Sequence, residues 1–217
     1  MTKSPGTATA ERESARGALL DAAERLLVEV GHAGITTRRL AEEAGVNHGL
    51  VHYYFGSMEN VLAETLERFT ERLIGRQREM YTSDRPFVEK WREAMRFMEA
   101  DQESGYQKVW LELHALAWNR PELRGRLAHV IGEWRGVLTE AFRAAQREYG
   151  VDDTSLPVAV AVTFVETSTL GMMLERHNDI REGQQELQAF VERWLESLGE
   201  GGADARAVSR RGRVRRS

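Results

Sequence analysis

Cysteine is absent from this chain of 217 residues, so it has no disulfide framework, no thiol nucleophile and no thiolate metal site. Long hydrophobic runs are also missing, since no apolar stretch approaches the roughly 18–20 residues that a membrane-spanning helix needs. The N-terminal sequence MTKSPGTATAERE lacks the hydrophobic core of a signal peptide. We therefore expect a cytoplasmic protein that does not enter a membrane.

The common signatures of catalysis are missing as well. The sequence contains no GxSxG, no phosphate-binding GxxxxGK[ST], no GxGxxG and no HExxH. Glu112 and His114 are a weak acid–base pair, because helical residues two positions apart do not face each other. The sequence therefore predicts neither an enzyme nor a bound cofactor.

An overall excess of basic residues, which is typical of a general nucleic-acid coat, is also lacking. The net charge is −4, and it divides into +4 for residues 200–217 and −8 for the rest of the chain. Residues 10–56 hold five arginines against seven acidic residues. Because phosphate contacts usually supply much of the affinity for DNA, any DNA binding would have to use a local basic face.

Residues 35–55, ITTRRLAEEAGVNHGLVHYYF, are the most informative stretch of the chain. They predict two short helices joined by a tight turn. Thr36 or Thr37 can cap the first helix, and Gly45 lies where a helix end favours a residue that tolerates positive φ. The second helix, about 48–54, is short and rich in hydrogen-bonding side chains, as in the recognition helix of a helix-turn-helix.

The wider segment 16–66, RGALLDAAERLLVEVGHAGITTRRLAEEAGVNHGLVHYYFGSMENVLAETL, resembles the DNA-binding domain of the tetracycline repressor (TetR) family of bacterial regulators. The resemblance covers the first helix, the glycine exit, the turn, the aromatic cluster and the start of the next helix. It implies a dimeric DNA-binding protein with a variable C-terminal ligand domain. This chain departs from the family at Leu50, His52, Tyr54 and Met58. At the position of Met58 the family often has a lysine that contacts a phosphate.

The same segment supplies the candidate DNA contacts, because Asn and His can hydrogen-bond base edges and Arg and Tyr suit guanines or phosphates. Carried over by the resemblance, they are Thr37, Arg38, Asn47, His48, Gly49, His52, Tyr53 and Tyr54. Alternatively, some of the aromatic residues pack the small three-helix core. His48 and His52 are four residues apart, but no third ligand lies nearby, so we expect no metal site.

Helical periodicity continues through the chain and predicts an all-α fold of about nine helices. The later helices are expected at about 57–80, 87–100, 105–118, 121–149, 156–177 and 184–198, although VAVAVTFV (158–165) could also form a strand. The predicted organisation is a disordered arm (1–11), a helix-turn-helix domain (12–56), a connecting helix (57–83), an effector-binding and dimerisation domain (84–199) and a disordered Arg-rich tail (200–217).

Methionine and aromatic residues gather on several of the later helices. The resemblance implies an apolar effector pocket between these helices, and flexible methionines suit a cavity that repacks. The candidate residues are Trp91, Met95, Met98, Trp110, His114, Trp118, Phe164, Thr167 and Met172. Taken singly, each of them is more typical of an ordinary core than of a pocket.

The predicted helices 8 (about 156–177) and 9 (about 184–198) carry more apolar surface than one small domain needs. They therefore predict a homodimer interface, with two recognition helices that read a palindromic operator in double-stranded DNA. We interpret the protein as a ligand-responsive transcriptional regulator, a repressor released by a small apolar or aromatic effector. The alternative is a small-molecule-binding helical protein or enzyme with a vestigial helix-turn-helix. The run SRRGRVRR (209–216) can contact phosphates or simply be solvated.

Overall fold

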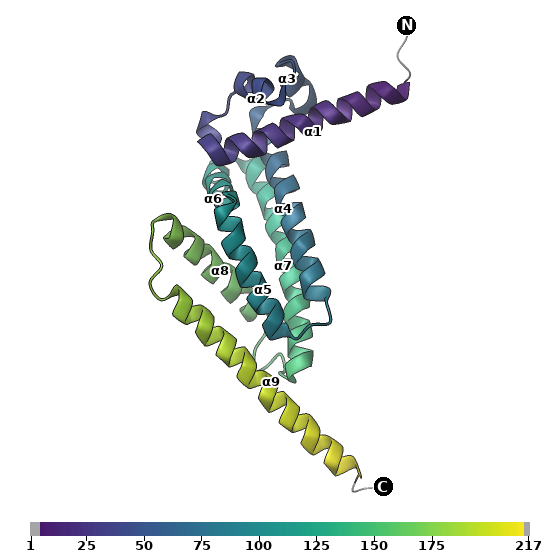
Figure 1. The fold of residues 1–217 in the computed structure, drawn as a ribbon, viewed down its shortest axis with the longest axis vertical. Coiled ribbons are helices and arrows are strands. Elements are labelled where there is room, and N and C mark those ends of the chain that lie inside the picture. The colour runs from purple at the N-terminus through teal and green to yellow at the C-terminus, as the bar shows by residue number, and fades with distance from the viewer. Residues whose placement is uncertain (1–4, 215–217) are drawn as a thin grey trace. The chain divides into compact units, whose positions relative to one another are not determined.

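The computed structural model describes residues 5–214, and all regular secondary structure in that range is helical (Figure 1). The elements are α1 (Pro5–Val30), the 3-10 turn η1 (His32–Gly34), α2 (Thr37–Ala44), α3 (Gly49–Phe55), α4 (Met58–Thr82), α5 (Phe87–Glu103), α6 (Tyr106–Ala117), α7 (Pro121–Tyr149), α8 (Val158–His177) and α9 (Gln184–Val214). The predicted all-α fold is confirmed, and the run that could have been a strand lies within α8.

The two end helices are longer than the sequence pattern suggested. α1 begins at Pro5 and α9 continues to Val214, so residues 5–11 and 200–214 are helical where we predicted disorder. The remaining residues of those predicted segments, 1–4 and 215–217, lie outside the described residues. Extending an existing helix adds one hydrogen bond for each residue fixed, and the alanines of both segments and the arginines of 200–214 favour a helix.

The chain divides into two units. The first comprises Met1–Leu73 and Asp101–Ile131, and the second comprises Ile74–Ala100 and Gly132–Ser217. α4, α5 and α7 each contribute to both units. The helix-turn-helix therefore shares a unit with α6 and the first part of α7, and not only with the start of α4.

The core of the first unit surrounds α1. Leu19 and Leu27 of α1 are fully buried together with Leu40 of α2, and they share one apolar cluster with Phe55 of α3 and Leu113 of α6. These residues recur at the spacing that places them on one face of each helix. Because α2 and α3 are short, they depend on this shared core for their position.

Leu40 offers a test of that dependence. Replacing it with alanine should lower the free energy of unfolding by about 2–5 kcal/mol, because the removed methyl groups leave a cavity in a fully packed site. Leu40 is 0% exposed, whereas Glu29 of α1 is exposed and serves as a control. Urea unfolding of both variants measures the difference, and equal midpoints for Leu40→Ala and Glu29→Ala would contradict this core assignment.

The core of the second unit is rich in aromatic side chains. The ring of Phe87 lies 5.5 Å from that of Phe142 and 6.2 Å from that of Tyr149, and all three belong to one cluster with Leu138 and Val162. Such tilted and edge-on contacts add to the apolar area that is buried. This cluster joins the start of α5, the end of α7, α8 and α9.

α8 corrects two expectations. We expected no segment long and apolar enough to span a bilayer, yet within the described residues α8 meets that requirement by length and composition. We also predicted that it would be buried on more than one side, but its apolar residues Val160, Phe164, Leu170 and Leu174 are exposed in the single chain. Phe190 and Trp194 of α9 are exposed as well. Soluble chains rarely leave so much apolar surface without a partner.

Candidate functional site

The turn between α2 and α3 is built as its sequence predicts. The Thr36 hydroxyl accepts a hydrogen bond from the Arg39 amide at 3.2 Å and caps α2. At the other end, Gly45 has φ 65°, in the left-handed region that favours glycine. The amide of Val46 then donates to the Ala41 carbonyl at 3.0 Å, which closes the helix end. The turn is therefore fixed by local hydrogen bonds.

The start of α3 is organised by Asn47. Its side-chain oxygen accepts a hydrogen bond from the Gly49 amide at 2.8 Å, which orders the backbone just before α3, while His48 is the N-cap residue and makes no side-chain cap hydrogen bond. A side chain at Gly49 would place a Cβ 3.3 Å from the same oxygen, so glycine gives this turn its space. His48 lies between them with its side chain exposed.

Most of the predicted DNA contacts lie on the surface. Thr37, Arg38, Asn47, His48, Gly49 and His52 are exposed, and Tyr53 is 64% exposed. Tyr54 is intermediate, because its ring packs against the core and lies 5.0 Å from the Tyr53 ring. The open alternative of aromatic packing thus applies to Tyr54, while Phe55 is buried in the core.

The charge on this surface is partly neutralised within the protein. The Arg38 guanidinium donates to Glu42 at 2.8 Å, and Arg25 donates to Glu43 at 2.8 Å. The hydrogen bond to Glu42 raises the pKa of Arg38. The Arg38 side chain is nevertheless 87% exposed, and an exposed ion pair is worth little. Arg38 can therefore exchange Glu42 for a phosphate or a base.

Arg39 is a further cation that the sequence analysis overlooked. It is exposed beside Arg38, and among the residues that the structure describes it has no carboxylate partner. The signal was its place in the first turn of the predicted helix, next to an arginine that we did select. It adds positive charge at the N-terminal end of α2.

Three of the predicted effector residues belong to the first unit. The rings of Trp110 and His114 lie 4.2 Å apart on α6, and His114 Nδ1 is 2.9 Å from the Trp110 carbonyl oxygen. Burial lowers the pKa of His114, which favours the neutral imidazole. Trp118 follows the end of α6 and is 76% exposed. The structure thus brings Trp110 and His114 together and leaves Trp118 at the surface.

The other six belong to the second unit. Trp91, Met98 and Met172 are buried, Met95 is half-buried, and Phe164 and Thr167 are exposed. The Thr167 hydroxyl donates to the Thr163 carbonyl within α8 at 2.7 Å.

A partly buried acid also lies on α8. Glu166 pairs with Arg135 of α7, and burial raises the pKa of Glu166. Its second carboxylate oxygen is buried without a hydrogen-bond partner among the described residues. Such an oxygen is costly to bury, and it can accept a hydrogen bond from a ligand or a water.

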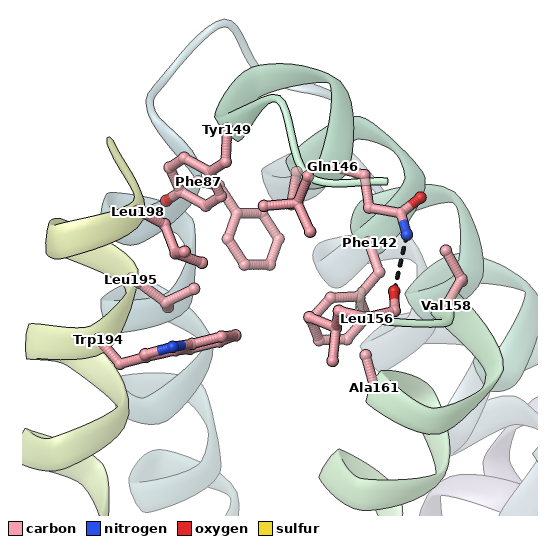
Figure 2. A pocket seen from close by; sticks show the side chains of 12 residues that line it. Phe87, Phe142, Gln146, Tyr149, Leu156, Val158, Ala161, Trp194, Leu195 and Leu198 are labelled. Carbon is pink, nitrogen blue, oxygen red and sulfur yellow. Dashed lines mark hydrogen bonds between the residues drawn. The ribbon is translucent and has the colours of Figure 1, made fainter. Parts of the chain in front are cut away.

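A small apolar hollow, partly open to solvent, lies elsewhere in the second unit. Figure 2 shows Trp194 and Leu195 of α9 on one side of it and Phe142 and Ala161 on the other. The lining residues are Phe87, Phe142, Ala145, Gln146, Tyr149, Val151, Leu156, Val158, Ala161, Trp194, Leu195 and Leu198. None of the nine predicted effector residues lines this hollow.

The hollow permits a packing test. Val158→Ile adds one methylene to its wall and should raise the free energy of unfolding by about 0.8 kcal/mol if the group is fully buried there. Val162, four residues along α8, is 1% exposed and does not line the hollow, so Val162→Ile should instead cost about 1–3 kcal/mol through overpacking. Denaturant unfolding distinguishes the two, and equal destabilisation would show that the hollow has no room.

Comparison with known proteins places the helix-turn-helix in a family. Residues 19–65 match the model described as bacterial regulatory proteins, tetR family. The repressor KstR2 of Rhodococcus jostii (strain RHA1) is 35% identical over 83 residues, which is 38% of this chain and 41% of that protein. The regulator BetI of Paraburkholderia xenovorans (strain LB400) is 32% identical over 123 residues, 55% of this chain and 62% of that protein. The chain thus matches less than two thirds of the length of either relative.

Solved structures extend the likeness to most of the fold. FadR from Bacillus subtilis, in complex with stearoyl-CoA, superposes with a TM-score of 0.65 at 21% identity over 85% of this chain and 97% of that one. A regulator from Saccharomonospora viridis, in complex with choline, gives a TM-score of 0.66 at 21% identity over 87% and 96%. At this identity the likeness concerns the fold, an N-terminal helix-turn-helix followed by a helical C-terminal part.

Proposed function

Because the chain belongs to the TetR family of bacterial regulatory proteins, we propose that it is a ligand-responsive, sequence-specific DNA-binding regulator. In this proposal it is a cytoplasmic repressor that a small apolar or aromatic effector releases from DNA. The observation that carries it is the capped turn, which holds a short helix with exposed hydrogen-bonding side chains. No catalytic step is assigned.

In the proposed complex, α3 enters the major groove. Asn47, His48 and His52 are exposed and can hydrogen-bond base edges, while the Tyr53 hydroxyl can reach a phosphate. Arg38 exchanges its exposed partner Glu42 for DNA. Since residues 10–56 lack an excess of positive charge, the proposed specificity comes from a few contacts on α2, on α3 and in the turn between them.

The proposed partner of the exposed apolar surface is a second copy of the chain. α8 and α9 would pair with the same helices of the other protomer in a four-helix bundle. The apolar residues exposed there include Phe164, Leu174, Phe190 and Trp194. A two-fold dimer presents two recognition helices to half-sites about one helical turn apart, which suits a palindromic operator.

The proposed effector is neutral or weakly polar. Methionine and aromatic side chains dominate the six candidate residues that belong to the second unit. Glu166 is the polar group best placed to orient a ligand, because one of its buried oxygens has no partner in the part of the chain that the structure describes. The effector can release DNA only by binding more tightly to the state whose recognition helices are misplaced.

The test is a selection of genomic DNA fragments by the purified protein, repeated at several salt concentrations. A palindromic site that stays enriched at physiological salt is the expected result. The genes next to that site would be the candidates for regulation. Weak, unspecific binding that disappears as salt rises would reject sequence-specific regulation. It would favour instead a small-molecule-binding protein with a vestigial helix-turn-helix, as the acidic net charge allows.

A further inference from the structure

The junction between α1 and α2 leaves backbone groups that need partners. α1 ends at Val30, Gly31 turns the chain with φ 70°, and η1 begins at His32. Helix ends have carbonyl and amide groups without intrahelical partners. Here the Gly31 amide is satisfied by the Leu27 carbonyl at 3.1 Å. The carbonyl of Val28 and the amide of His32 still need partners.

α6 supplies both partners from one face. The Glu112 carboxylate accepts a hydrogen bond from the His32 amide at 2.8 Å, and the same oxygen lies 3.4 Å from His32 Nδ1. The Lys108 ammonium donates to the Val28 carbonyl at 3.3 Å. Lys108 and Glu112 are four residues apart, so they lie one turn from each other on the same side of α6.

The signs of the two charges suit their places. An ammonium favours the negative C-terminal end of α1, and a carboxylate favours the positive N-terminal end of the turn that follows. The Glu112 side chain is 25% exposed, so its hydrogen bond to His32 is partly shielded from solvent. Charge-assisted hydrogen bonds of this kind are stronger than neutral ones.

Two glycines allow the close approach of α6 to α1. A Cβ on Gly31 would lie 2.7 Å from a Glu112 carboxylate oxygen, and a Cβ on Gly105 would lie 2.6 Å from a methyl group of Val28. Both glycines have positive φ, 70° and 79°. A side chain at Gly105 would press on Val28, and one at Gly31 would displace the Glu112 carboxylate that accepts the hydrogen bond from His32.

From these contacts we propose that Glu112 and Lys108 are positioning residues that clamp α6 to the end of α1 and so fix the orientation of the DNA-reading helices. α1 shares its core with α2 and α3. A rotation of α1 about its C-terminal end would therefore move the recognition helix as well. α6 follows α5 directly through Ser104 and Gly105. The clamp connects α6 to the helix-turn-helix directly through these hydrogen bonds. This connection is additional to the covalent link through α4.

The clamp can be tested without DNA, by amide hydrogen exchange at His32. Glu112→Ala removes the acceptor and should speed exchange of that amide by roughly tenfold or more, as loss of a hydrogen bond to a charged group implies. Glu112→Gln keeps a side-chain oxygen and should restore most of the protection. Glu103 is exposed near the start of α6, so Glu103→Ala is the matched control. Unchanged exchange in Glu112→Ala would overturn the clamp.

The DNA readout rests on the proposed function and measures spacing selectivity. The wild type should prefer the selected palindrome over the same half-sites moved apart by one base pair, and Glu112→Ala should lose that preference by roughly tenfold. Affinity for an isolated half-site should stay unchanged, whereas a general loss of folding would lower it too. Lys108→Met keeps the aliphatic stem and should act in the same direction.

If the wild type selects no palindrome, the proposed function fails while the exchange test of the clamp still stands. A wild-type spacing preference that both variants retain would overturn the clamp itself.

Discussion

Replacing Arg38 and His48 together with alanine should weaken specific operator binding by about 2–6 kcal/mol, since a good contact to a base edge is worth about 1–3 kcal/mol. Both side chains are exposed, on either side of the turn. Arg38 has to break only its exposed ion pair with Glu42 to bind DNA. Breaking an exposed ion pair costs little free energy, so most of the energy of the DNA contact contributes to binding. His48 precedes the first residue of α3 and is not engaged in capping.

Titration of labelled operator and of a scrambled sequence at one salt concentration measures this loss. Arg124 and His129 of α7 are also exposed, so Arg124→Ala/His129→Ala removes the same side chains elsewhere and should leave specific binding nearly unchanged. Binding to the scrambled sequence should fall less than binding to the operator, because only phosphate contacts contribute there. Full operator affinity in the Arg38/His48 variant would reject these two residues as base contacts.

The helices were predictable from sequence where local signals mark their ends. α7 was expected at 121–149 and lies there, because Pro121 favours a first helical position and Gly150, with φ 70°, ends the helix. α1 also begins at a proline, Pro5, but the outer residues of α1 and α9 are mainly polar or small. Polar composition suggested disorder there, while the helix-forming residues extend helices that already exist.

The exposure of the proposed DNA contacts was also predictable, because most of them are neighbouring residues in one turn and one short helix. The remaining contacts join distant parts of the chain. Glu112 and His32 are 80 residues apart, and periodicity shows which face of a helix is apolar without showing which other helix it meets. For the same reason the nine predicted effector residues fell into two different units. Their role as a pocket remains a proposal.

The exposed faces of α8 and α9 lead to the second large effect. Phe164 is 51% exposed and Phe190 is 61% exposed in the single chain. Fully burying one such side chain contributes about 1.5–3 kcal/mol, and in a two-fold interface each residue is buried twice. Phe164→Glu/Phe190→Glu removes this contribution and also places four carboxylates in an apolar contact, where burying a charge without a partner is costly.

We therefore expect the Phe164/Phe190 variant to be a folded monomer at protein concentrations where the wild type is a dimer. Analytical ultracentrifugation measures the association, and circular dichroism confirms the helix content. Ala128 is exposed on α7, so Ala128→Glu adds the same charge outside α8 and α9 and should stay dimeric. The monomer should also bind the palindrome no better than a single half-site, since it offers one recognition helix. A variant that remains dimeric would show that the two copies meet through another surface.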